Sequence, residues 1–312
     1  MRIIRDTHFI DPDDRGAAAA IGNFDGVHLG HQAVIDLTRK AAQETGAPLG
    51  IMTFEPHPRS YFSKETNPFR LMNAEAKAHR LEKLGLEKLY EVPFNAALAA
   101  LPARDFAQTV IADQLGLKHV VVGADFCFGK DRSGNASNLA AMGAEMGFGV
   151  TIAPMMQVAA ADVSSTAIRQ ALTDGRPADA AKMLGHWHRL ENTVIHGDQR
   201  GRDLGYPTAN MSIDGLHPPK FGVYAVKIDV RDGPHVGTYD GAASIGVRPM
   251  FGENRPNCET FIFDFSGDLY GTTVSVALVE YLRPELKFDG LDALITQMDA
   301  DCAKAREILS NV

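Results

Sequence analysis

Residues 22–31 read Gly-Asn-Phe-Asp-Gly-Val-His-Leu-Gly-His, between a small apolar run at 17–21 and an amphipathic stretch at 32–45. A glycine-rich corner between a buried strand and a helix start offers backbone N–H groups and the positive end of the helix dipole, which attract phosphate. His28 and His31 stand three apart, so on a helical first turn they point to one side. The corner therefore predicts an α/β unit with two imidazoles beside an anion site.

Two other interpretations of this corner are an ordinary strand-to-helix turn with surface histidines and a zinc pair. The recurrence of glycine at 22, 26 and 30 favours a phosphate site over an ordinary turn. Zinc-binding histidines on a helix usually stand four apart in His-Glu-x-x-His, and that pattern is absent here. We take the following as nucleotide-binding residues: Gly22, Asn23, Phe24, Asp25 and Gly30.

Short apolar runs alternate with helix-like segments from residue 17 to residue 154. The predicted strands are 17–21, 49–54, 88–92, 118–123 and 150–154, and the predicted helices are 32–45, 74–84, 103–115 and 136–146. This alternation is typical of a Rossmann-like parallel sheet with helices on both faces. Ligands bind such sheets at the carboxyl ends of the strands. The loops at 22–31, 55–58 and 124–129 should therefore emerge at one edge.

The pattern changes after Gly185. Predicted strands at 193–196, 223–230, 235–245, 258–265 and 272–282 follow one another, and only 291–308 is helical. Consecutive strands of this kind favour a small antiparallel barrel capped by a C-terminal helix. We therefore expect two domains, at 1–184 and 185–312.

Composition limits the class of protein. The 312 residues carry a net charge of −8, and neither half is basic, which argues against nucleic acid as a partner. Cys127, Cys258 and Cys302 form no Cys-x-x-Cys pair, so reduced thiols in a cytoplasmic protein are expected. Neither a secretory leader nor an 18-residue apolar run is found, so no membrane partner is expected.

Three further motifs of the first half point to a ligand. In Thr-Phe-Glu-Pro-His-Pro (53–58) two prolines stiffen a loop, and Phe62 follows as one wall of a slot for a flat ring or as a core aromatic. Asp125, beside Phe126 and Phe128, is placed to accept a hydrogen bond from a ribose or amine. Residues 164–169 (Ser-Ser-Thr-Ala-Ile-Arg) open a helix whose Arg169 can reach a phosphate, although plain helix capping is the alternative.

The second half carries its own dense motif. Residues 200–210 read Arg-Gly-Arg-Asp-Leu-Gly-Tyr-Pro-Thr-Ala-Asn, in which Gly201 and Gly205 permit close approach of an anion. On an extended segment Thr208 and Asn210 point the same way, and their oxygens suit Mg²⁺. A polar turn between strands is the alternative. Glu259, in an apolar strand, is either a general base for a substrate hydroxyl or an outward-facing glutamate.

These parts fit nucleotidyl transfer, in which a phosphate monoester attacks the α-phosphorus of a nucleoside triphosphate. Such an acceptor is already anionic, so no nucleophilic side chain is needed. Alignment, cations and N–H groups around the developing charge can supply the catalysis.

In their order and spacing these motifs closely resemble the prokaryotic bifunctional riboflavin kinase/FMN adenylyltransferase family, the FAD synthetases, over nearly the whole chain. The His-x-Gly-His element at 28–31 is shared with other nucleotidyltransferases. Pro-Thr-Ala-Asn at 207–210 is typical of riboflavin kinases. The chain departs from the family pattern at Cys127, Met250 and Phe261, which puts affinity and rate in doubt more than reaction type.

The resemblance implies a role for each matched position. His28, His31 and Arg169 would act on ATP phosphates in adenylyl transfer, and Glu259 would deprotonate the riboflavin 5′-hydroxyl. Thr208 and Asn210 would hold Mg²⁺ and ATP. The remaining expected phosphate, flavin and adenosine contacts are Ser164, Thr166, Pro56, Pro58, Phe62, Asp125, Phe128, Arg200, Gly201 and Gly205.

The resulting hypothesis is two consecutive reactions, riboflavin to FMN in the second half and FMN to FAD in the first. Mg²⁺ is the expected cofactor and ATP the co-substrate. The expected partners are riboflavin, FMN, FAD and ATP, for a monomer or weak homo-oligomer. Two alternatives are a non-catalytic flavin-binding regulatory module and a nucleotidyltransferase for a different acceptor.

Overall fold

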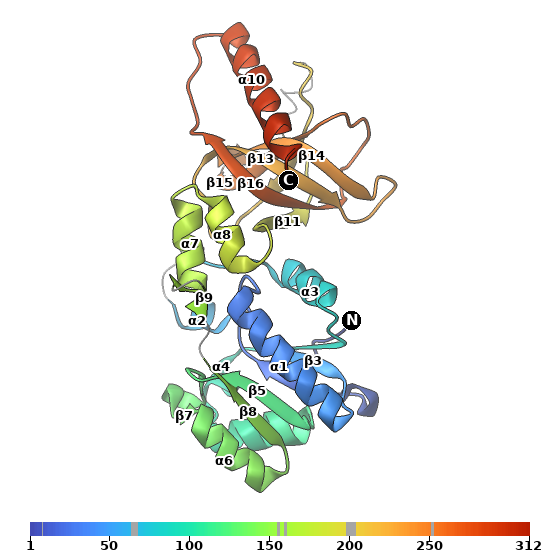
Figure 1. The fold of residues 1–312 in the computed structure, drawn as a ribbon, viewed down its shortest axis with the longest axis vertical. Helices are drawn as coiled ribbons and strands as arrows, with labels where there is room; N and C mark the ends of the chain where they lie inside the picture. The colour runs from blue at the N-terminus through green and yellow to red at the C-terminus, as the bar shows by residue number, and fades with distance from the viewer. Residues whose placement is uncertain (8, 64–67, 155–156, 159–160, 198–203, 251–252) are drawn as a thin grey trace. The chain divides into compact units, whose positions relative to one another are not determined.

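The computed structural model describes residues 1–7, 9–63, 68–154, 157–158, 161–197, 204–250 and 253–312 (Figure 1). The chain folds into two compact units. The first comprises residues 1–66 and 77–163, and the second comprises 67–76 and 164–312. Residues 164–184 therefore belong to the second unit. The border of the two functional domains at 184/185 stays a prediction.

A six-stranded, all-parallel sheet forms the centre of the first unit, in the order β1-β4-β3-β2-β5-β8. Its strands are β1 (Arg2–Ile4), β2 (Ala18–Ile21), β3 (Leu49–Glu55), β4 (Lys88–Pro93), β5 (His119–Gly123) and β8 (Gly149–Ala153). The five predicted strands and the parallel sheet are confirmed. The edge strand β1 was not predicted, because three residues carry too little pattern to detect.

Helices α1 (Leu29–Thr45) and α6 (Ala136–Met146) and the π-helical η2 (Phe106–Gln114) pack on this sheet. The chain also forms α2 (Pro58–Phe62), α3 (Ala74–Lys83), α4 (Ala96–Ala99) and α5 (Ala103–Asp105). Short elements complete the unit: η1 (Pro12–Asp14), η3 (Lys130–Arg132), the β6–β7 pair (Cys127–Phe128, Gly134–Asn135) and the β9–β10 pair (Gln157–Val158, Ala161–Asp162). The helix predicted at 103–115 thus forms as α5 and η2 in succession.

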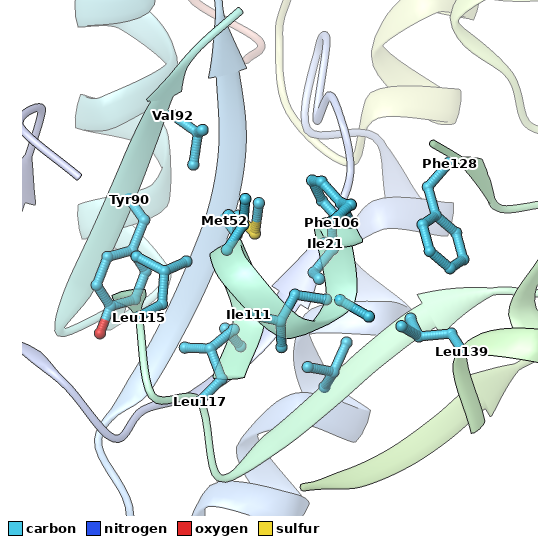
Figure 2. Packing of buried hydrophobic residues seen from close by; sticks show 14 of the residues in the cluster. Ile21, Met52, Tyr90, Val92, Phe106, Ile111, Leu115, Leu117, Phe128 and Leu139 are labelled. Atoms are coloured by element: carbon cyan, nitrogen blue, oxygen red, sulfur yellow. The ribbon is translucent and has the colours of Figure 1, made fainter. Parts of the chain in front are cut away.

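Alternate residues of the strands supply the two layers of the core. On one face Ile21, Met52 and Tyr90 belong to one core cluster with Ile111 of η2 and Leu139 of α6 (Figure 2). The intervening strand residues, which point to the opposite face, are also buried. The helix α1 contacts β2, β3 and β5. Strands buried on both faces explain the continuous apolar runs in the sequence.

The strand order places a switch point beside β2. The chain runs from β2 to β3 and β4 toward one edge, then returns to β5 on the other side of β2. In open parallel sheets the crevice at such a point binds ligands. Residues 22–28, which leave the carboxyl end of β2, therefore lie where this topology positions a site.

In the described part of the second unit an antiparallel six-stranded sheet is accompanied by helices. The strands are β11 (Arg189–Thr193), β12 (Thr208–Ser212), β13 (Gly222–Val230), β14 (Gly237–Met250), β15 (Glu253–Ile262) and β16 (Thr273–Arg283), in the order β11-β16-β13-β14-β15-β12. The helices are α7 (Ser165–Thr173), α8 (Pro177–Leu184) and α10 (Leu291–Leu309). Ile195 donates its N–H to the Asn210 carbonyl at 2.8 Å and so joins the two end strands.

The predicted barrel with a C-terminal helix is confirmed. Apolar residues of β11, β13 and β16, among them Leu190, Val226 and Val276, fill its interior. The helix α10 packs on β13, β14 and β16 through Ala305 and Leu309 (Figure 1). The strand predicted at 193–196 forms earlier, as β11, and Ile195 contributes only a single bridge. No helix of the described residues has the length and apolar character that a membrane span requires.

A buried histidine is expected to make the second unit sensitive to acid. His188 is 1% exposed, and neither of its ring nitrogens has a hydrogen-bond partner among the described residues. Burial, with the nearby charges of His186 and His217, lowers the pKa of His188 from 6.5 to about 3. Below pH 6.5 His188 binds a proton in the unfolded chain but stays unprotonated in the native state. The free energy of unfolding should therefore fall by about 1.4 kcal/mol per pH unit toward pH 3.

Replacing His188 by leucine should flatten this dependence. Urea unfolding can be followed between pH 7.5 and 4 by the fluorescence of Trp187, the single tryptophan, which adjoins His188. The His188→Leu protein and the wild type should differ by a constant free energy above pH 7, and the difference should change progressively below 6.5. Parallel curves over the whole range would show that His188 is not the cause.

Candidate active sites

The corner after β2 is held in an unusual backbone conformation. The N–H of Gly22 donates to the carbonyl of Met52 at 3.1 Å, which ties the start of the corner to β3. Phe24 and Val27 then adopt positive φ angles of 51° and 45°. Positive φ is an outlier for a β-branched residue, and such strain concentrates at functional sites.

His28 and His31 are brought face to face at the start of α1. Their rings stack with centroids 3.7 Å apart and planes 16° from parallel. His28 caps the helix, since its side chain accepts a hydrogen bond from the His31 N–H at 3.3 Å. A Cβ on Gly30 would lie 3.1 Å from the His28 ring, so glycine there lets the imidazole fold over the helix start. The predicted same-side placement is confirmed, and His28 is buried rather than on the surface.

The two imidazoles differ in what they can do. Because Nδ1 of His28 accepts a hydrogen bond, a neutral His28 carries its proton on Nε2 and is a donor there. Burial, followed by the charges of His28 and Lys77, holds the pKa of His31 well below its usual 6.5. Nδ1 of His31 is buried and has no hydrogen-bond partner among the residues described. The pair therefore places the Nε2–H donor of His28 and the uncharged ring of His31 at the N-terminus of α1.

A buried lysine beneath this corner was not predicted from the sequence. Lys77 is 3% exposed, and its Nζ donates to Glu55 Oε1 at 2.9 Å and to Thr53 Oγ1 at 3.1 Å. Thr53 Oγ1 in turn donates to the carbonyl of Asn23 at 3.3 Å. The sequence holds one indication that Lys77 faces inward. It stands four residues before Leu81 on a predicted helix, so it shares the face of that apolar residue, which is buried in the structure.

The stiff loop after β3 leads into a group of aromatic rings. Pro56 follows a cis peptide bond, and Pro58 begins α2. Tyr61, Phe62 and Phe94 contact one another edge to face, with centroids 5.2 to 5.6 Å apart. Phe62 is 66% exposed and Tyr61 is 41% exposed, so Phe62 is not a core aromatic, and the two rings can present a wall to a flat ligand.

The loop after β5 exposes Asp125 but buries Phe128. Asp125 is exposed at the carboxyl end of the sheet, where a ligand can reach it. Phe128 is buried, packs on Phe106 at 5.6 Å and stacks with Phe126 at 5.5 Å. Its ring supports the loop from inside. Cys127, one of the departures from the family pattern, is exposed.

The motif at 164–169 is part of the second compact unit. Ser164 caps α7, because its Oγ accepts the Ala167 N–H at 3.2 Å, so the capping alternative is structurally correct. Thr166 is exposed in the first turn. Arg169 donates from Nε to the Phe69 carbonyl at 2.5 Å, with its guanidinium 5.5 Å from the Phe69 ring centroid. Their contact with a phosphate stays a prediction.

Strand pairing brings the second-half motif and the proposed base together. Asn210 of β12 is the register partner of Glu259 on β15, and Thr208 is the partner of Phe261. Directly opposite residues have side chains on the same face of a sheet. The flanking Cys258 points into the barrel core, so Glu259 is on the opposite face, with Thr208 and Asn210. Thr208 to Asn210 are therefore part of a strand, whereas Leu204 and Gly205 form a turn, so the polar-turn alternative holds only for that part of the motif.

Local hydrogen bonds orient these groups. Nδ2 of Asn210 donates to the Thr208 carbonyl at 3.2 Å and to its Oγ1 at 3.3 Å. Nδ2 of Asn257, two residues before Glu259, donates to Glu259 Oε1 at 3.5 Å. Asn257 was missed by the sequence analysis, although period-2 alternation places it on the face of Glu259.

The rest of the 200–210 motif is only partly visible. Arg200 and Gly201 lie outside the described residues. Gly205 has a φ of +84°, and Tyr206 packs on Phe261 at 5.1 Å while its hydroxyl donates to Asp299 on α10. Met250, another position at which the chain differs from the family pattern, is the last residue of β14.

We expect Gly197 to control the position of the Asn210 amide. A Cβ at residue 197 would lie 2.7 Å from Cγ of Asn210, so alanine must displace that side chain. Gly197→Ala should therefore lower riboflavin phosphorylation about tenfold or more without changing adenylylation of added FMN. Steady-state assays of both reactions measure this. The control is Gly237→Ala on β14, whose Cβ meets Tyr239 at an ordinary 3.4 Å; equal loss in both variants would contradict the explanation.

Comparisons with known proteins agree with this division of sites. The family model described as FAD synthetase matches residues 10–167, and the one described as Riboflavin kinase matches residues 184–309. The bifunctional riboflavin kinase/FMN adenylyltransferase of Pseudomonas fluorescens is 39% identical over 99% of this chain and 98% of its own. The Escherichia coli K12 protein of the same name is 36% identical over 98% and 97%.

A solved structure has the same fold over nearly its full length. It is titled a macrolide-efflux protein from Streptococcus pneumoniae, and it superposes with a TM-score of 0.80 at 32% identity, covering 96% of both chains. A parallel nucleotide-binding sheet followed by a flavokinase-type barrel defines a two-domain flavin nucleotide-forming enzyme. The chain belongs to the bifunctional riboflavin kinase/FMN adenylyltransferase family.

Proposed function

We propose that the polar face shared by β12 and β15 phosphorylates riboflavin and that the corner after β2 adenylylates the FMN so formed. The observation that carries the first assignment is the register pairing of Asn210 with Glu259. The second is supported by the stacked His28–His31 pair at the switch point of the parallel sheet. The two reactions are those of the family to which the chain belongs.

In the kinase step Glu259 accepts the proton of the riboflavin 5′-hydroxyl as its oxygen attacks the γ-phosphorus of ATP, and ADP leaves. Asn257 holds the carboxylate through its donated hydrogen bond. The hydroxyl of Thr208 and the amide of Asn210 are hard oxygen donors beside a carboxylate, a set that fits Mg²⁺. When bound, that ion would neutralise charge on the ATP phosphates.

In the adenylyl step a phosphate oxygen of FMN attacks the α-phosphorus of ATP and pyrophosphate leaves. His28 donates from Nε2, and the helix start supplies N–H groups, toward the charge that develops. Tyr61, Phe62 and Phe94 offer a wall for the flavin ring. The motif that contains Ser164, Thr166 and Arg169 is assigned to the phosphates, and Asp125 to the adenosine, on their match to the family pattern.

The proposal is tested by following products over time. The full chain with riboflavin, ATP and Mg²⁺ should form FMN first and FAD second, and with added FMN it should form FAD and pyrophosphate directly. Chelation of Mg²⁺ by EDTA should stop both reactions. A protein that binds flavin but leaves ATP intact would instead be a binding module. We further propose that the protein acts in the cytoplasm, which its three free cysteines support. We also propose that it is a monomer or a weak homo-oligomer.

A further inference from the structure

We propose that Lys77 is a positioning residue of the adenylyl-transfer site, holding the backbone of Asn23 through Thr53 and setting the charge around the two histidines. This inference rests on the proposed adenylyl transfer at the corner after β2. Lys77 itself does not touch the reacting atoms in this proposal.

The geometry is a continuous relay beneath the corner. Lys77 Nζ donates to Thr53 Oγ1 at 3.1 Å, and that hydroxyl donates to the Asn23 carbonyl at 3.3 Å. Thr53 is fully buried, on the face of β3 opposite to the core residues Met52 and Phe54. Asn23 directly precedes the strained Phe24, and its carbonyl fixes how the following N–H groups are aimed. A corner whose donors must be preorganised gains from such a support.

Stability alone gives no reason for a lysine at this position. Removing an ammonium from water is costly, and a buried ion pair is often no more stable than apolar residues of similar volume. Lys77 is 3% exposed and its partner Glu55 is also largely buried, with 20% of the side chain exposed. A buried charge kept under a strained corner is better explained by a role in the site.

The second link is electrostatic. The groups that act on the His31 ring are His28 on its own turn and Lys77 on α3, after burial itself. Glu55 and Thr53 on β3 hold the ammonium in place. A fixed cation there favours an uncharged His31 and adds to the positive potential that an incoming triphosphate meets.

The test compares three single variants in the full chain. Lys77→Met removes both the hydrogen-bond relay and the positive charge, whereas Thr53→Val removes only the hydroxyl of the relay. The control is Lys83→Met, which replaces an exposed lysine on the same helix. Adenylylation of FMN should fall about 10- to 100-fold in kcat in the first two and stay unchanged in the third. The loss of kcat in the Lys77→Met/Thr53→Val double variant should be smaller than the product of the two single losses, because both residues belong to one hydrogen-bond network.

Two readouts separate positioning from loss of folding. Riboflavin phosphorylation by the same chains should be unchanged. In NMR titrations the pKa of His31 should move upward in Lys77→Met, where the cation is lost, but stay at its wild-type position in Thr53→Val. Wild-type kcat in Lys77→Met, or an unmoved His31 titration, would overturn the inference. Absence of FAD formation by the wild-type chain would instead defeat the proposed function.

Discussion

Glu259→Gln should reduce FMN formation from riboflavin by about 10²- to 10⁴-fold, the usual contribution of a general base. Glutamine keeps the shape of the side chain and can still meet Asn257, but it cannot take the proton of the 5′-hydroxyl. The same protein should convert added FMN to FAD at the wild-type rate, because the corner after β2 belongs to the other compact unit. Product analysis with riboflavin and with FMN measures both reactions.

The matched control for this variant is Glu280→Gln. Glu280 is a half-buried glutamate on β16 of the same barrel, paired with Ala225 rather than with β12. It should leave both reactions within about twofold of the wild type, because the substitution conserves the shape of the side chain and lies away from the β12–β15 face. Kinase activity that survives in Glu259→Gln would show that the hydroxyl loses its proton to another group.

Replacement of His28 should have the opposite selectivity. Loss of one preorganised donor typically costs about 10²- to 10³-fold in kcat, so His28→Ala should nearly abolish FAD formation and leave the kinase intact. His28 is also the cap of α1, and removal of a cap costs about 1 kcal/mol of stability. The alanine variant therefore mixes a catalytic loss with a structural one.

His28→Asn separates these two contributions. Asparagine is a good helix cap, so this variant should recover the thermal stability that alanine loses. It has no imidazole Nε2–H and should stay as inactive in adenylylation as His28→Ala. If His28→Asn made FAD within a few-fold of the wild-type rate, capping would be the whole function of His28, and the phosphate donor would lie elsewhere.

The features that could be predicted from the sequence depend on local periodicity. The three-residue spacing of His28 and His31 predicted rings on one side, and the structure stacks them. The two-residue spacing of Thr208 and Asn210 predicted a common face, which the β12–β15 register confirms. The predicted parallel sheet and barrel followed from the same periods applied to longer runs.

Contacts between distant segments could not be predicted in this way. Lys77 lies 22 residues from Glu55, and nothing in either segment marks them as partners. The pairing of Asn210 with Glu259 depends on the lengths of the connections between β12 and β15, which no local pattern encodes. The positive φ angles of Phe24 and Val27 were missed because neither residue type favours that conformation.

The register of β12 and β15 also limits how this barrel can change during evolution. Side chains alternate along a strand, so a single-residue insertion within either strand would turn Asn210 or Glu259 toward the core and separate the two groups. Point substitutions can be tolerated on these strands, whereas an insertion or deletion of odd length would remove the kinase in one step. Length variation among descendants of this chain should therefore accumulate in the loops.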